Sequence, residues 1–369
     1  MQELLKEFLE IYAITLILTN EVKSSDCSAQ NLVSNTMETT AWTKLITIML
    51  ILVSHQELFT ESVEVGVNYG FLGNDLPNPT DAVKLLLDKR IPMVRIFEPK
   101  IEVLQALKGT SIGVSLGVKN QDLAYLASSQ QATTDWINTY VTPFINDVTI
   151  LFISVGNEVI PGENAQYLLP AIKNFYWSLD AANLWRLELT TVMSGSVLAS
   201  TYPPSQAVIT DQTMMDVLSF LYSKSEPIMV NVYPYFALNS DPSNINLDYA
   251  LSNSKTPAFT DENLTYYGLF EAMFDSFSAA IAKVVGKDDM DIILSETGWP
   301  TAGGQFATVE NARIYNNNFK NIALKGTPRY DRPFEAFIFA LFNENQKPGQ
   351  DEQNFGNFYP NMKPVYPLW

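Results

Sequence analysis

Short hydrophobic runs recur along the chain from residue 65 onward, and polar or helix-like segments separate them. The runs are rich in Val, Ile and Phe and are almost unbroken by polar residues, which is typical of parallel strands buried on both faces. They predict strands over 65–69, 93–97, 112–118, 152–157, 188–193, 228–233, 291–296 and 336–343.

Between these strands, apolar residues recur at spacings of three and four positions, which predicts amphipathic helices. Helical patterns begin at Asp81 and cover 168–179, 214–224, 270–285 and 309–325. Eight strand–helix units in about 300 residues predict an α/β fold, a (β/α)8 TIM barrel built as a single domain. A doubly wound open sheet is the alternative, but no glycine-rich phosphate loop follows the first strand.

The N-terminal part of the chain lacks this alternation. The apolar run over 45–53 follows a lysine, is too short to span a bilayer and resembles the hydrophobic region of a signal peptide. Because Met37 lies just upstream, we expect residues 1–36 to be an upstream extension, 37–63 a signal peptide and 64–369 the mature domain. A buried N-terminal helix is the alternative, since a second apolar stretch lies farther upstream.

Secretion would make one further motif relevant. Asn263-Leu264-Thr265 is a sequon for N-glycosylation within a polar stretch. A secreted domain of about 300 residues can bury a large core without disulfides, so their absence does not argue against this route.

Composition narrows the chemistry that the mature domain can perform. The one histidine, His55, and the one cysteine, Cys27, both lie in the part that we expect to be removed. This excludes Ser-His-Asp and Cys-His nucleophiles as well as disulfides, and it argues against a zinc site. Acid–base chemistry then falls to Asp, Glu, Lys or Tyr, and we expect neither a metal nor an organic cofactor. The formal net charge of −17 argues against nucleic acid as a partner.

Two acidic residues close matching strands. Glu158 directly follows the strand predicted over 152–157, and Glu296 is the last residue of the strand predicted over 291–296. In a TIM barrel, the C-terminal strand ends face the mouth where catalysis takes place, and two carboxylates are the minimum for cleaving a glycosidic bond. The alternative role for each is a helix cap or a loop acid. Arg95, inside the second predicted strand, is expected to pair with an interior carboxylate rather than with substrate.

The sequence around these acids resembles glycoside hydrolase family 17, the plant endo-β-1,3-glucanases. The resemblance covers 65–369, and its most specific motifs include Glu296 and Lys347. The matching segments are Val65-Gly66-Val67-Asn68-Tyr69-Gly70, Val94-Arg95-Ile96-Phe97, Ile153-Ser154-Val155-Gly156-Asn157-Glu158-Val159, Tyr202-Pro203-Pro204-Ser205, Val230-Asn231-Val232-Tyr233-Pro234-Tyr235-Phe236, Leu294-Ser295-Glu296-Thr297-Gly298-Trp299-Pro300 and Phe342-Asn343-Glu344-Asn345-Gln346-Lys347.

The resemblance implies a retaining endo-hydrolase of (1→3)-β-D-glucosidic linkages in callose or fungal wall glucan. Glu296 would be the nucleophile that forms a covalent glycosyl-enzyme, and Glu158 the proton donor and later the base. Tyr233 would hydrogen-bond the nucleophile, and Asn157 would contact the sugar hydroxyl next to the reacting carbon.

The resemblance also implies a wider set of substrate-binding residues around the mouth. These are Tyr69, Asn157, Tyr233, Tyr235, Trp299, Glu335, Glu344 and Lys347. Glu335, Glu344 and Lys347 would orient sugar hydroxyls and tune the proton donor, or else form a surface ion-pair network. Tyr235 and Trp299 would stack on sugar rings, or else fill the barrel core.

The same residues leave other activities open. These are hydrolysis of mixed-linkage β-1,3-1,4-glucan, non-hydrolytic glucan binding, and transglycosylation through the same covalent intermediate. The expected partner is a β-glucan polysaccharide, with no membrane contact in the mature form and a monomeric state. No vacuolar extension follows Trp369, so family analogy implies secretion to the extracellular space or cell wall.

Overall fold

The computed structural model describes residues 63–369, so the expectations for the upstream extension and for 37–62 of the signal peptide lie outside the described residues. Nine parallel strands form the main sheet of this part of the chain. They are β1 Val65–Tyr69, β2 Met93–Ile96, β3 Gly113–Val118, β4 Thr149–Val155, β5 Glu188–Thr190, β6 Val192–Met193, β9 Ile228–Asn231, β12 Ile292–Thr297 and β13 Ala336–Ile338.

The sheet closes on itself at one divided strand. Its order is β5-β4-β3-β2-β1-β13-β12-β9-β6, so the two outer strands are β5 and β6, which Thr191 alone separates in sequence. The Thr191 hydroxyl donates to the Val155 carbonyl at 2.7 Å, and the Thr191 carbonyl accepts from the Met229 amide at 3.0 Å. β5 and β6 therefore act as one barrel strand, and the predicted (β/α)8 TIM barrel is confirmed.

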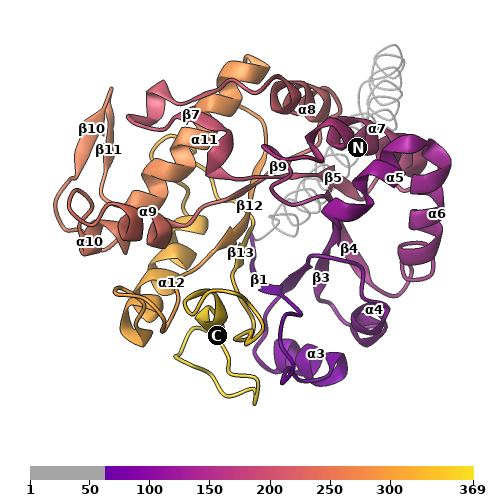
Figure 1. The fold of residues 1–369 in the computed structure, drawn as a ribbon, viewed down its shortest axis with the longest axis horizontal. Coiled ribbons are helices and arrows are strands. Elements are labelled where there is room, and N and C mark those ends of the chain that lie inside the picture. Colours follow the sequence, from indigo (N-terminus) through magenta and orange to yellow (C-terminus); the bar gives the residue numbers. More distant parts are fainter. Residues whose placement is uncertain (1–62) are drawn as a thin grey trace, which may run out of the picture. The chain divides into compact units, whose positions relative to one another are not determined.

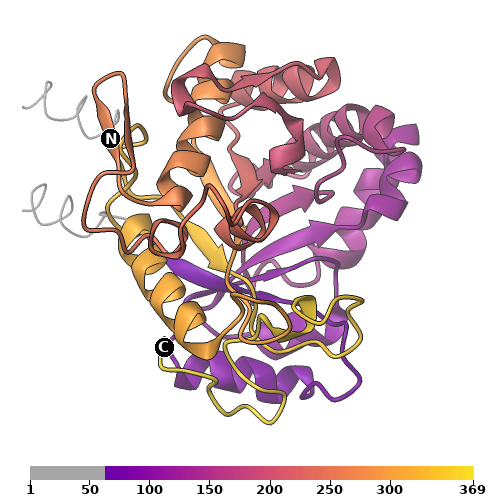
Figure 2. The same ribbon diagram turned by 60° about the vertical axis from the view of Figure 1, so that its left-hand side comes forward.

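Helices surround the barrel strands, as Figures 1 and 2 show. They are α3 Pro79–Asp88, α4 Ile101–Leu107, α5 Leu123–Ser128, α6 Gln130–Tyr140, α7 Ala165–Ala181, α8 Gln212–Ser223, α9 Pro234–Ser240, α10 Leu247–Ala250, α11 Leu269–Val285 and α12 Val309–Ala323. Several begin at a polar side chain that accepts a hydrogen bond from a main-chain amide of the first turn, which is the usual way to fix a helix start. These capping residues include Asn78, Ser129, Asp211 and Thr308.

The last barrel strand is shorter than the sequence predicts. β13 ends at Ile338, whereas the predicted strand extends to residue 343 and its hydrophobic run to Phe342. The chain beyond it still follows its neighbours, because the Phe339 amide donates to the Thr297 carbonyl at 2.7 Å and the Leu341 amide to the Asn68 carbonyl at 2.8 Å. This segment is therefore hydrophobic because it is buried beside β12 and β1, although it does not form a regular hydrogen-bonded strand with them.

Alternate residues of the strands divide the barrel interior into two layers. Toward the N-terminal ends lies a buried apolar cluster of Met93, Phe152, Val192, Met229, Ile293 and Phe337. Two positions farther along four of these strands come polar residues, namely Arg95, Ser154, Asn231 and Ser295. Because side chains repeat every two residues along a strand, the polar set lies on the same side as the apolar set and nearer the mouth. The apolar layer is the floor of the site described below.

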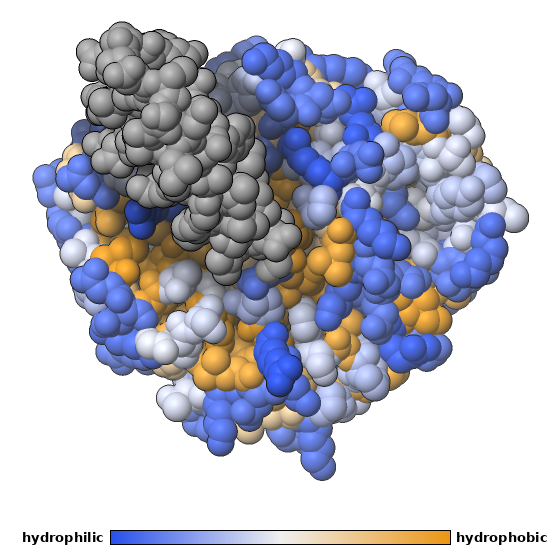
Figure 3. Space-filling view, turned by 180° about the vertical axis from the view of Figure 1, so that it is seen from behind, coloured by the Kyte–Doolittle hydropathy of each residue, from blue (hydrophilic) through white to orange (hydrophobic). Residues whose placement is uncertain are grey.

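The outer surface is mixed in polarity. Figure 3 shows hydrophilic residues around the rim of one face and hydrophobic residues nearer its middle. Within residues 63–369, no helix is long and apolar enough to cross a membrane.

One sheltered acid makes the stability of the barrel depend on pH. Glu226 precedes β9, and its carboxylate accepts a hydrogen bond from the Leu189 amide of β5 at 2.7 Å. Burial raises the pKa of Glu226 to about 7, with a smaller contribution from the charge of Glu188, while the Leu189 hydrogen bond opposes the shift. Folding therefore favours the protonated form, so the stabilisation is full below about pH 4.5 and is lost as the pH rises through about 7.

We expect a Glu226→Gln variant to be more stable than the parent above about pH 7 and to match it below about pH 4.5. Glutamine keeps an acceptor for the Leu189 amide and has no charge to desolvate. Thermal unfolding across this range measures the effect, at about 2–4 °C for each kcal/mol in a domain of this size. The control is Glu163→Gln, at an exposed position. A Tm difference that does not change with pH would contradict the prediction.

Candidate active site

Glu296 lies beside an irregularity in β12 that changes the direction of its side chain. In the pairing with β9, Leu294 and Glu296 face consecutive residues, so Ser295 is an extra residue in β12. Such a bulge redirects side chains. As a result, two adjacent residues both contact interior groups: the Ser295 hydroxyl donates to Asn231 Oδ1 at 2.6 Å, and Glu296 accepts from Arg95 at 2.8 Å.

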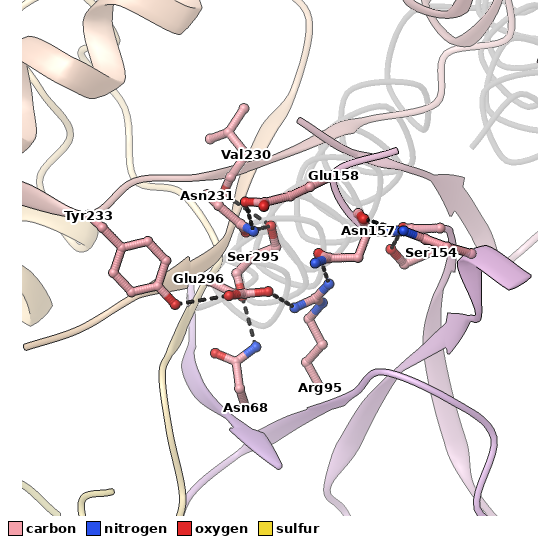
Figure 4. Close-up of polar contacts among 12 residues, drawn as sticks. Asn68, Arg95, Ser154, Asn157, Glu158, Val230, Asn231, Tyr233, Ser295 and Glu296 are labelled. Carbon is pink, nitrogen blue, oxygen red and sulfur yellow. Dashed lines mark hydrogen bonds and ion pairs between the residues drawn. The ribbon is translucent and has the colours of Figure 1, made fainter. Parts of the chain in front are cut away.

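Both oxygens of the Glu296 carboxylate are held. Oε1 accepts from Arg95 Nη1 at 2.8 Å, and Oε2 accepts from the Tyr233 hydroxyl at 2.9 Å, as Figure 4 shows. Arg95 is 1% exposed and Glu296 is 7% exposed, and burying either charge alone would be costly. Each residue therefore compensates the charge of the other. Burial, then the Glu296 charge, raises the pKa of Tyr233 well above its ordinary value, which keeps this phenol a neutral donor. The expected contacts of Arg95 and Tyr233 are thus both present.

Arg95 also fixes Asn157. Its Nη2 donates to Asn157 Oδ1 at 2.9 Å. The main chain of Asn157 is held as well, because its amide donates to Asn120 Oδ1 and its carbonyl accepts from Asn120 Nδ2, both at 2.8 Å. One arginine therefore connects the Glu296 carboxylate to the Asn157 amide group, whose Nδ2 is left as a donor.

Glu158 is carried by a sharp turn at the end of β4. Gly156 has φ 74° and Glu158 has φ 52°, in the left-handed region that non-glycine residues rarely adopt. The Glu158 amide donates to the Val192 carbonyl at 3.2 Å, which fixes the turn against β6. Its carboxylate accepts from Asn231 Nδ2 at 2.8 Å. Unusual backbone at a polar strand end is a frequent mark of a functional site.

Asn231 connects the two acids. It donates to Glu158 and accepts from Ser295, the residue before Glu296, so groups from β4, β9 and β12 converge in the mouth (Figure 4). Part of Glu158 is open to solvent, but its carboxyl group is sheltered by the surrounding protein, and this desolvation raises its pKa. The Asn231 hydrogen bond opposes the shift, and the negative charge of Glu296 adds to it. The site therefore favours a protonated Glu158 beside a charge-compensated Glu296.

A second polar cluster lines the same mouth. Glu344 is 3% exposed and accepts from the Leu72 amide at 2.8 Å, and burial raises its pKa. Lys347 Nζ lies 4.0 Å from Glu344 and 3.4 Å from Glu352. Glu352 is not among the site residues predicted from the sequence, although its charge also acts on Glu158. The acidic pair of Asp351 and Glu352, close after Lys347, was the available signal.

Three expected sugar contacts lie in the core instead. Tyr69 is 1% exposed, and Tyr235 and Trp299 are fully buried. The Tyr235 and Trp299 rings pack on each other with centroids 5.3 Å apart, and Trp299 Nε1 donates to the Phe306 carbonyl at 2.9 Å. Their burial does not support the expectation that the Tyr235 and Trp299 rings stack on substrate, because neither ring has an exposed face. The alternative, barrel core, holds for Tyr235 and Trp299.

Glu335 lies at the wrong end of the barrel for the role expected of it. It directly precedes β13, whose first residue, Ala336, pairs with Val65 at the start of β1. The mouth lies at the C-terminal ends of these strands, so Glu335 belongs to the opposite end. Sequence position near Glu344 suggested a shared cluster, but a whole strand separates the two residues.

A cavity of about 460 Å³ opens beside these groups. Its wall combines three aromatic rings, Phe71, Phe97 and Phe339, with charged and amide groups, which is typical of a site for a polar ligand with apolar faces. The wall includes Gly70, Phe71, Leu72, Phe97, Glu98, Lys119, Asn120, Asn157, Glu296, Phe339, Glu344 and Lys347. Within residues 63–369, no group of three or more His, Cys, Asp or Glu is arranged to hold a metal ion.

The model of the family described as glycosyl hydrolases family 17 matches residues 65–368. The chain belongs to glycosyl hydrolase family 17. The match spans the whole barrel, including both acids, and it confirms the resemblance that the strand-end motifs indicate.

Proteins similar to this family 17 chain include plant glucanases. The chain is 47% identical over 308 residues to a Hordeum vulgare protein named as a candidate glucan endo-1,3-beta-glucosidase, GVI, covering 82% of this chain and 95% of that one. A solved structure of CJP38, a beta-1,3-glucanase and allergen of Cryptomeria japonica pollen, shares 42% identity with a TM-score of 0.79, covering 83% and 98% of the two chains. One of two plant beta-glucan endohydrolases with distinct substrate specificities shares 38% identity, again with a TM-score of 0.79, covering 82% and 99%.

Proposed function

We propose that this protein is a glucan endo-1,3-β-glucosidase that cleaves internal linkages of β-1,3-glucan. The observation that carries the proposal is the pair of carboxylates in one barrel mouth, with Glu296 charge-compensated by Arg95 and Glu158 favoured in its protonated form. Two carboxyl groups in different protonation states are what glycoside hydrolysis needs. The names of the family 17 relatives support β-1,3-glucan as the substrate.

The reaction that we propose retains the configuration of the sugar. Glu296 attacks the anomeric carbon while Glu158 gives its proton to the leaving oxygen, so a carbon–oxygen bond to the enzyme forms as the glycosidic bond breaks. Water then attacks the same carbon, Glu158 takes a proton from it, and the Glu296 carboxylate leaves. Retention needs carboxyl groups about 5–5.5 Å apart. Asn231 donates to Glu158 and accepts from Ser295, the residue before Glu296, which supports close placement of the two acids.

The pKa of Glu158 would change during this cycle. The negative charge of Glu296 is one of the causes that raise it. Once Glu296 is esterified, that charge is gone, the pKa of Glu158 falls, and the group becomes better suited to accept a proton from water. The same side chain can thus act first as acid and then as base.

Substrate would be held by the groups around the two acids. Asn157 Nδ2 is placed to donate to the sugar hydroxyl next to the reacting carbon, while Glu344 and Lys347 orient further hydroxyls. The rings of Phe71 and Phe97 give the cavity apolar wall on which sugar faces can pack.

The test is reducing-sugar release by the purified protein from linear β-1,3-glucan and, in parallel, from mixed-linkage β-1,3-1,4-glucan. Short oligomers from the first alone support the proposal. Activity on the second alone would move the assignment to mixed-linkage hydrolysis, and transfer to added acceptors would indicate transglycosylation. If folded protein released no product from either glucan, a non-hydrolytic binding role would be favoured.

The stereochemistry of the first product tests retention. NMR during the first minutes of the reaction should show the β-anomer, and the α-anomer as the first product would refute retention.

We further propose that the protein acts outside the cell, as a monomer and without a cofactor. The apolar run over 45–53 supports a signal peptide, although some relatives are named vacuolar isoforms. N-terminal sequencing of secreted protein tests this, since a mature chain that begins upstream of Met37 would refute the signal peptide proposed for 37–63. Size-exclusion chromatography with light scattering tests the monomer.

An Asn231→Ala variant is expected to stay active to higher pH than the parent. The Asn231 hydrogen bond stabilises the ionised form of Glu158 and so lowers its pKa. Without it, Glu158 stays protonated to higher pH, and the alkaline limb of kcat/KM moves upward. The control is Glu226→Gln, outside the mouth, whose pH–rate profile should match the parent's. An alkaline limb that moves downward would contradict the assignment of Glu158 as the acid.

A further inference from the structure

A two-stranded hairpin lies apart from the barrel sheet and carries a feature that hydrolysis does not use. β10 (Phe259–Asp261) and β11 (Leu264–Tyr266) pair in antiparallel fashion, with Asp261 opposite Leu264. The turn therefore consists of two residues, Glu262 and Asn263, and both are exposed. Glu262 has φ 54°, as tight two-residue hairpins require at a turn position. Figure 1 shows this hairpin at the edge of the described domain.

The strands of the hairpin are fixed at both ends, beside the turn and at the base, whereas the two turn residues make no such contacts. The Asp261 carboxylate accepts from the amide and the hydroxyl of Ser205, both at 2.7 Å. The Tyr266 hydroxyl donates to the buried carboxylate of Asp275 on α11 at 2.9 Å. These contacts hold both strands against the body of the domain, so Asn263 is presented at a defined and accessible place.

Asn263 is the first residue of the sequon Asn263-Leu264-Thr265. Within the described part of the chain, the Asn263 side chain has no hydrogen-bond partner, so a substituent on its Nδ2 would break no internal contact. The other Asn-x-Thr segment of the chain, Asn78-Pro79-Thr80, has proline at the middle position, which prevents modification. Asn78 is also occupied, because its side chain caps α3. Asn263 is therefore the single usable acceptor in the sequence.

We propose that Asn263 is N-glycosylated when the chain enters the secretory pathway. The donor class is an oligosaccharide linked through diphosphate to a lipid. A bond forms between Asn263 Nδ2 and the first anomeric carbon, the bond from that carbon to the diphosphate oxygen breaks, Nδ2 loses a proton, and the lipid diphosphate leaves. The exposed tip accommodates the glycan in the folded domain, because neither turn residue is packed against the barrel.

The experiment is expression of the full chain behind a secretion signal in eukaryotic cells, with mass spectrometry of the peptide that contains residue 263 from the medium and the membrane fractions. We expect a glycan on Asn263 in most molecules, and conversion of this residue to aspartate when a peptide N-glycosidase removes the glycan. Asn263 left unmodified in most chains of both fractions would overturn the proposal.

Matched variants separate the sequon from the asparagine alone. Asn263→Gln and Thr265→Ala should both lose the glycan, because one removes the acceptor and the other the hydroxyl that completes the sequon. Thr265→Ser should keep it. Glycan on the Thr265→Ala variant would contradict sequon recognition. Glucan hydrolysis should be unchanged in Asn263→Gln, since the hairpin contributes no residue to the cavity wall.

Discussion

A Glu296→Gln variant is expected to lose hydrolysis of β-1,3-glucan by at least about 10⁴-fold in kcat, as removal of a covalent nucleophile does in other enzymes. The single oxygen of glutamine can still accept from Arg95, and its NH2 group can donate to the Tyr233 hydroxyl oxygen, but glutamine cannot form the glycosyl ester. Initial rates on linear β-1,3-glucan, together with binding of the same glucan by calorimetry, measure the effect. Binding should persist while turnover is lost.

The matched control is Glu335→Gln. This residue is the same amino acid in the same barrel, but it precedes β13 at the end opposite the mouth. It should hydrolyse glucan at close to the parent rate. Near-parent activity in the Glu296 variant would refute the nucleophile assignment, and a collapse of both variants would indicate a general effect of acid removal on the fold.

A Glu158→Gln variant is expected to lose about 10²–10⁴-fold on glucan, because the sugar leaving group needs a proton. The loss should depend on the leaving group. With an aryl glycoside of a β-1,3-gluco-oligosaccharide whose phenol is acidic, the first step needs no proton, so a burst of phenol should precede a slow steady state. The alkaline limb of the pH–rate profile, which reports loss of the Glu158 proton, should disappear.

Glu344→Gln is the informative comparison for this second prediction. Burial raises the pKa of Glu344 as well, yet we place it in substrate orientation rather than in proton transfer. It should raise KM and keep the alkaline limb. No burst of phenol from the Glu158 variant, with the first step slowed on the aryl glycoside as much as on glucan, would show that Glu158 does not donate the proton.

Most of the fold could be predicted because barrel strands are encoded locally. Near-continuous apolar runs such as 112–118 and 152–157 specify strands buried on both faces, and helical spacing fills the intervals. The division of 188–193 at Thr191 could not be seen, because it depends on pairing with two different neighbours, β4 and β9. The early end of β13 could not be predicted either, because a buried segment has the same hydrophobic sequence whether or not its main chain pairs regularly with neighbouring strands.

From the sequence, only those residues of the site that stand at the ends of predicted strands could be placed correctly. Glu158 and Glu296 follow apolar runs, so the sequence predicted that both lie at strand ends in the barrel mouth, and the structure places them there. Trp299 and Tyr235 stand in the same motifs but are buried, because a sequence does not tell on which side of a strand end a ring packs. Glu335 was assigned to the mouth because it is close to Glu344 in the sequence. Glu352 was not predicted, because η5 (Glu352–Asn354) reaches the mouth only through tertiary folding.

The bulge in β12 has a consequence for protein engineering. The direction of residue 296 is set by main-chain pairing with β9, so it does not depend on which side chain stands there. Different reactive or inert groups could be installed at one fixed point above the apolar floor without redesigning the backbone. With a small side chain such as alanine, the space left by the carboxylate would be available to an activated glycosyl donor, and the barrel would become a scaffold for building glucans instead of degrading them.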